Sequence, residues 1–158
     1  MKIIPLICGL ATITALAACA SDEDHTTADS GTSVGSDGIT VAKLYDYVLP
    51  LGATEIEDKT AAEGTYFWDA YYPEMSTEAL ATYIYSNPPR KELDMTLVYD
   101  QPLNDESETH EWCWHTPANG EGVFEKVMIF NVSTYEGKTL FSAAAGSDTI
   151  GCVQPTGS

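Results

Sequence analysis

The apolar residues of this chain are divided between a short N-terminal stretch and a long C-terminal region, which limits where a core can form. Every Trp, Tyr and Phe residue lies within residues 41–158, whereas residues 20–40 are polar and strongly acidic. A segment of that composition cannot bury enough apolar surface to offset the loss of conformational entropy on folding. The sequence therefore predicts one domain over 41–158 and a flexible acidic linker over 19–40.

Hydrophobic periodicity within residues 41–158 predicts one helix among several strands. Ser76 is a favourable N-cap, and Pro88 ends the helix that follows it. Strands are expected over 53–57, 64–72, 95–99, 110–115, 123–132 and 138–144, with a short helical turn over 44–48. Two strands, a helix and then three or four strands indicate an α+β fold, with the helix packed on a mostly antiparallel sheet of about five strands.

The N-terminal stretch has the profile of a cleaved secretory signal. Lys2 provides a positive charge, and the 16 residues from Ile3 to Ala18 are predominantly apolar. A helix of that length is shorter than the ~20 residues needed to cross the hydrocarbon core of a bilayer. We therefore expect residues 1–18 to be removed during export.

The end of this stretch, Leu16–Cys19, resembles the lipobox of bacterial lipoproteins. The resemblance implies cleavage after Ala18 and attachment of fatty acyl chains such as palmitate to Cys19. Two or three acyl chains hold a protein firmly on a membrane, whereas one binds only marginally. By analogy with Gram-negative lipoproteins, Ala20 favours the outer membrane over the inner one. The alternative is a plain secretory signal in which Cys19 has no special role.

Cys113 and Cys152 are the two cysteines that remain once the signal and the lipidated residue are set aside. In the oxidising cell envelope, a cysteine pair within one small domain predicts a disulfide. If both thiols stayed reduced, they and the nearby Glu111 and His115 would suit zinc. The disulfide and the zinc site are mutually exclusive interpretations of the same cysteines.

An acidic loop over residues 100–108 is the other candidate metal site. Its carboxylates are Asp100, Asp105, Glu106 and Glu108. Calcium prefers oxygen ligands of this kind, but the loop lacks the residue pattern of an EF-hand. The alternative is a solvated acidic turn without a bound ion.

The aromatic residues near the second expected strand form a candidate ligand site. Trp68, Asp69, Tyr71 and Tyr72 combine rings with a carboxylate, an arrangement that suits sugars. Large aromatic residues in a strand equally suit packing beneath a helix. The glycan site and the core are therefore both open interpretations of these residues.

The charge and the motifs narrow the function. All 24 acidic residues lie after Cys19, but only six of the seven basic residues do, because Lys2 lies before it. Such a chain repels phosphate backbones, which argues against nucleic-acid binding. Motifs of nucleophilic hydrolases and phosphate-binding loops are lacking.

We expect a membrane-anchored envelope lipoprotein without enzymatic activity that binds a protein partner or supports envelope structure. A module for a glycan or divalent cation is the alternative, and a hydrolase is the least favoured interpretation.

Overall fold

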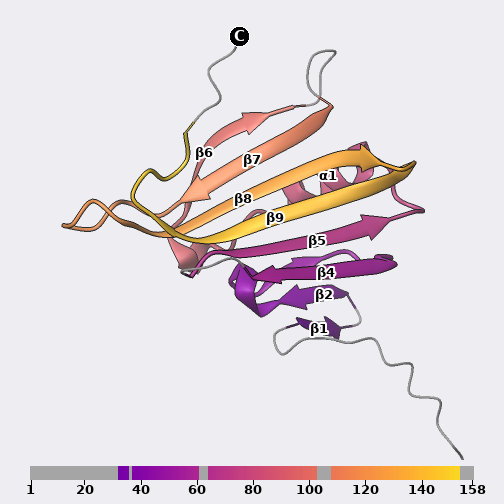
Figure 1. The fold of residues 1–158 in the computed structure, drawn as a ribbon, viewed down its shortest axis with the longest axis horizontal. Helices are drawn as coiled ribbons and strands as arrows, with labels where there is room; N and C mark the ends of the chain where they lie inside the picture. The colour runs from indigo at the N-terminus through magenta and orange to yellow at the C-terminus, as the bar shows by residue number, and fades with distance from the viewer. Residues whose placement is uncertain (1–31, 36, 61–63, 103–107, 154–158) are drawn as a thin grey trace, which may run out of the picture.

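A computed structural model of the chain describes residues 32–35, 37–60, 64–102 and 108–153, which contain nine strands and one α-helix (Figure 1). The elements are β1 (Thr32–Gly35), β2 (Gly38–Val41), β3 (Tyr47–Leu49), β4 (Glu55–Thr60), β5 (Tyr66–Tyr72), α1 (Thr77–Ser86), β6 (Thr96–Gln101), β7 (Thr109–His115), β8 (Phe124–Tyr135) and β9 (Lys138–Asp148). The combination of one α-helix with antiparallel strands agrees with the expected α+β class. The expected strand number was too low, because the nine strands form two sheets. In these ranges no helix is long and apolar enough to cross a membrane.

The larger sheet has six antiparallel strands in the order β4-β5-β9-β8-β7-β6. The β8–β9 hairpin occupies its centre, and the charged strand β4 lies at one edge. Side chains alternate strictly along β5, where Tyr66, Trp68, Ala70 and Tyr72 are buried and the intervening residues are more exposed. This alternation gives the sheet two chemically different faces.

Helix α1 covers the apolar face of this sheet. The Ser76 side chain accepts a hydrogen bond of 3.2 Å from the backbone N–H of Ala79, which caps the first turn as expected. Leu80, Ala81 and Ile84 are the buried residues of the helix and belong to the main core. Figure 1 shows α1 behind β8 and β9, so the helix and the viewer are on opposite sides of the sheet.

A three-stranded sheet, ordered β1-β2-β3, completes the layer on that side. Ile39, Val41 and Leu49 from this sheet are buried in the same core as α1. Tyr47 packs edge-on against Phe130 of β8, with ring centroids 4.7 Å apart. The small sheet and α1 together therefore form one covering layer over the apolar face of the large sheet.

The small sheet corrects two expectations. The flexible linker was expected to continue to Thr40, but residues 32–35 and 38–41 form paired strands. The signal and the linker residues before Thr32 lie outside the described part of the chain. The helical turn expected over 44–48 is a 3₁₀ turn over Ala42–Leu44, and β3 follows it. Short strands with few apolar residues give too weak a sequence pattern to separate from a linker.

The buried position of Ile39 tests whether the small sheet is part of the folded domain. Its side chain is 3% exposed, whereas that of Ile56 on β4 is 43% exposed. We expect Ile39→Ala to lower the free energy of unfolding by about 2–4 kcal/mol, because it leaves a cavity in the core. Ile56→Ala, the matched control, should change it by less than about 1 kcal/mol. Urea denaturation of both variants measures this, and equal losses would contradict the assignment.

Candidate functional site

The face of the six-stranded sheet that points away from α1 has no second layer over it in the described residues; we call it the open face. Strand register places one polar side chain from each of the six strands in a row across this face. These residues, the polar row, are Glu57, Asp69, Ser142, Asn131, Glu111 and Gln101. Side chains directly opposite one another on neighbouring strands are close enough to interact. The row therefore presents a continuous line of hydrogen-bonding groups.

An apolar row runs beside the polar row. Phe67, Ala144, Ile129, Cys113 and Tyr99 are successive partners across five strands. A pocket of about 200 Å³ opens along this row, with apolar walls that include Phe67, Ile129, Ala144 and Val127. Asp148 also lines the pocket. The open face thus combines a shallow apolar pocket with an adjacent polar line.

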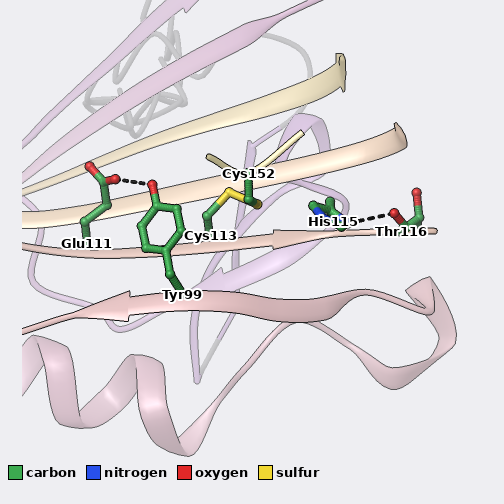
Figure 2. Close-up of a disulfide and its surroundings, with 6 residues drawn as sticks. All are labelled: Tyr99, Glu111, Cys113, His115, Thr116 and Cys152. Carbon is green, nitrogen blue, oxygen red and sulfur yellow. Dashed lines mark hydrogen bonds between the residues drawn. A yellow bond between two sulfur atoms is a disulfide. The ribbon is translucent and has the colours of Figure 1, made fainter. Parts of the chain in front are cut away.

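The C-terminal segment crosses one end of the open face and is fixed there by the predicted disulfide. Cys152 is bonded to Cys113 of β7 (Figure 2). Gly151 lies so close to the Phe124 ring that an added Cβ would be 2.8 Å from it. We call residues 149–153 the strap. The disulfide closes a span of 39 residues, which in the chain-entropy account stabilises the fold by about 4 kcal/mol.

Beneath the strap is a second, smaller apolar cluster. Tyr99, Cys113 and Val127 are its buried members, and Phe124 and Ile129 pack against them. Val127 and Ile129 also line the pocket, so the pocket begins where the cover provided by the strap ends. The strap therefore closes one end of the apolar row and leaves the other end accessible.

Tyr99 connects the small cluster to the polar row. Its hydroxyl donates a hydrogen bond to Glu111 (Figure 2). Burial raises the pKa of Tyr99 well above its ordinary value of 10.0, and the hydrogen bond and negative charge of Glu111 raise this pKa further. Because the tyrosine stays protonated, it holds the Glu111 carboxylate in place at neutral pH.

Asn131 lies at the centre of the polar row, between Glu111 on β7 and Ser142 on β9. Its side-chain oxygen is buried, and no described residue donates a hydrogen bond to it. A buried acceptor without a donor costs roughly 1–3 kcal/mol. An external donor would reach this oxygen only if the Asn131 side chain turned outward.

The structure divides the four residues of the candidate glycan site between the two faces of the sheet. Trp68 and Tyr72 are fully buried on the apolar face of β5, so they belong to the core and cannot contact a ligand. Asp69 and Tyr71 point to the open face, as strand alternation requires. The four residues therefore do not form one platform, although two of them remain accessible.

The candidate calcium loop is not assembled in the described residues. Asp105 and Glu106 lie outside them, and Glu108 is exposed. Asp100 is engaged elsewhere, in hydrogen bonds with Tyr85 and His110. The part of the structure that is described contains no group of three or more His, Cys, Asp or Glu residues that would hold a metal ion.

The zinc interpretation is wrong for the cysteines, because both sulfur atoms are used by the disulfide. A disulfide sulfur is not the thiolate that zinc requires. The other two proposed ligands also have partners: Glu111 accepts the Tyr99 hydroxyl, and His115 Nδ1 donates to the carbonyl of Thr116 at 2.8 Å.

A Tyr–His–Asp cluster on the opposite face was not anticipated from the sequence. His110 Nε2 donates to Asp100 Oδ1 at 2.7 Å, and the Tyr85 hydroxyl donates to Asp100 Oδ2 at 2.6 Å. His110 also stacks on Trp112, with ring centroids 3.7 Å apart. Since Tyr85 is on α1 and the others are on β6 and β7, the cluster fastens the helix to that edge of the sheet. Burial, followed by the hydrogen bond and charge of Asp100, raises the pKa of Tyr85.

Comparison with models of known protein families finds no match for this chain, and comparison with curated protein sequences finds none either. No role for any residue of the open face is therefore taken from another protein. Its chemistry follows from the strand register, the pocket and the disulfide described above.

The Tyr99–Glu111 contact has a testable alkaline signature. The folded state raises the pKa of Tyr99, so its contribution to stability is complete below pH ~10 and is lost as the pH rises above that value. We expect Glu111→Gln to lower the pKa of Tyr99 towards its ordinary value, while burial keeps it elevated. NMR of the Tyr99 ring carbons during an alkaline titration measures the shift. Titration of Tyr99 at the same pH in both proteins would contradict the contact.

Proposed function

We propose that this protein is a lipid-anchored binding module of the cell envelope, and that the open face of its six-stranded sheet is the binding surface. The observation that carries the proposal is the composition of that face. A covering layer buries one side of the sheet, whereas the other side presents an apolar pocket beside a polar row. Apolar pockets with a few well-placed polar groups are typical of binding sites.

The chemistry of the described residues supports binding rather than catalysis. His110, the most buried histidine candidate for a general base, is 5% exposed, and its Nε2 is engaged with Asp100. A general base needs access to the substrate proton that it removes. The arrangement instead suits a fastening between α1 and the sheet, which leaves the open face as the accessible site.

The short length of chain between the expected anchor and the first strand supports the proposal. Cys19 is the expected acylated residue, and β1 begins at Thr32. Thirteen residue steps separate the two, which span at most roughly 45 Å. A lipid on Cys19 would therefore keep the open face close to the membrane surface and to whatever is fixed there.

A glycan remains the second candidate for the ligand. Asp69 and Tyr71 lie on the open face, beside the hydroxyl and amide groups of Ser142 and Asn131. Aromatic rings with neighbouring hydrogen-bonding groups can bind sugar rings. The loss of Trp68 and Tyr72 to the core removes two of the three aromatic rings on which this interpretation depended.

Site-specific photo-crosslinking in intact cells tests the proposal. A photo-reactive phenylalanine analogue at Phe67, which is 43% exposed on the open face, should give a crosslinked product of higher mass. The same analogue at Thr82, an exposed position on α1, should give none. Equal products from both positions, or none from Phe67, would contradict the open face as the binding surface.

The same cells test the anchor through Cys19→Ser. In the unchanged chain, we expect a mature N-terminus at Cys19 that carries acyl mass, and a protein that sediments with membranes. The variant should lack the acyl mass and should lose the Phe67 crosslink, since the domain is no longer held near its partner. An unmodified N-terminus in the unchanged chain would refute the anchor.

A further inference from the structure

We propose that the partner of the open face is a positively charged polypeptide segment that places one large apolar side chain in the pocket and lysine or arginine side chains along the polar row. This inference rests on the proposed function and adds the chemical class of the partner. Three properties of the face support it: its charge, its unsatisfied acceptor and the size of its pocket.

The charge of the face favours a basic partner. In the described residues, the face carries the carboxylates of Glu57, Asp69, Glu111 and Asp148 against two lysine positions: Lys138, and Lys59, which the register pairs with Phe67. The balance of charge on the face is therefore negative. Lys138 lies at the end of the sheet, 5.8 Å from the centre of the Tyr71 ring, rather than within the polar row. Complementary charge speeds association and selects among partners.

The hydrogen-bonding groups at the centre of the face favour a donor. The Asn131 side-chain oxygen is buried without a donor, and the neighbouring Glu111 carboxylate is held in position by Tyr99. Lysine, arginine and backbone N–H groups are donors, and a carboxylate and a carboxamide oxygen accept from them. A donor on the partner would bind the Glu111 carboxylate, and would also satisfy the Asn131 oxygen if that side chain turned outward on binding.

The pocket favours a side chain over a free small molecule. Its volume is about 200 Å³, whereas pockets for small ligands usually enclose roughly 300–1,000 Å³. Its apolar walls suit one large side chain, and an apolar anchor in a pocket commonly supplies most of the binding energy of a protein interface. Phe67 and Ile129 would pack against such an anchor.

The spacing of Asp69 and Glu111 argues against a single metal ion that binds both of these carboxylates. Asp69 and Glu111 are separated by β9 and β8, which amounts to three strand spacings or roughly 14 Å. One cation cannot bridge that distance through direct ligands. Several separate positive groups on one chain can occupy the row, as a basic segment would provide.

Fluorescence anisotropy with defined peptides tests this inference on the mature, lipidated protein in detergent. The probe is a short labelled peptide that alternates lysine with phenylalanine or leucine. A second peptide replaces lysine with glutamate, and a third replaces the apolar residues with glycine. We expect binding of the first alone, weakened by added salt, because both the charge and the apolar anchor are required.

Charge-matched variants separate the open face from general attraction to an acidic protein. Asp69→Asn combined with Glu111→Gln should weaken binding of the lysine–phenylalanine peptide by about fivefold or more. Glu74→Gln combined with Glu92→Gln changes two exposed residues outside the six-stranded sheet and should weaken it by less than about twofold. Ala144→Phe fills the pocket without changing charge and should also weaken binding. Melting temperatures near that of the unchanged protein confirm that the variants fold.

Three outcomes would overturn the inference. The two double variants could weaken peptide binding equally, or the peptide with glycine in place of its apolar residues could bind as tightly as the lysine–phenylalanine peptide. A neutral oligosaccharide could also bind, with its binding lost when Asp69→Asn and Glu111→Gln are combined. In the last case the open face is still a binding surface, so the proposed function stands and the partner class is wrong. Absence of a Phe67 crosslink in cells whose chain keeps Cys19, in contrast, refutes the proposed function itself.

Discussion

The structure depends on one constraint: a six-stranded sheet has two faces, and the described chain supplies a covering layer for only one of them. The side chains that β5, β7, β8 and β9 contribute to the main core point to the same side, where α1 and the small sheet bury them. The alternation of side chains along each strand then directs the intervening residues to the other side. The polar row and the pocket are therefore a direct consequence of how the core is built, and any shift of strand register by one residue would exchange the two faces.

The disulfide fits this division of the sheet. Cys113 points away from the main core, so its bond to Cys152 holds the strap on the open face rather than within the core. There the strap covers a small cluster of Tyr99, Cys113 and Val127 that would otherwise be exposed. The disulfide thus adds stability on the side of the sheet where packing is weakest, while the pocket beside the strap stays accessible.

Strong local patterns allowed much of the fold to be predicted from the sequence. The strand over 64–72, the Ser76 cap and the disulfide each depend on nearby residues or on a simple chemical preference, and all three predictions are confirmed. The small sheet was missed because β1 and β2 contain few apolar residues. The polar row was missed because it joins six strands that are distant in sequence, and only their pairing order brings those residues together. The choice between core and ligand site at Trp68 required knowledge of which face the helix covers.

Hydroxyl-radical labelling of the purified mature protein is the most direct test of the two-faced sheet, because it reports side-chain exposure residue by residue. Three consecutive aromatic residues of β5 provide the comparison: Phe67 is 43% exposed, whereas Tyr66 and Trp68 are 6% and 0% exposed. The account predicts oxidation of Phe67 and protection of both neighbours, even though a free indole ring reacts more readily than a phenyl ring. Oxidation of Trp68 in the folded protein as fast as that of Phe67 would contradict it.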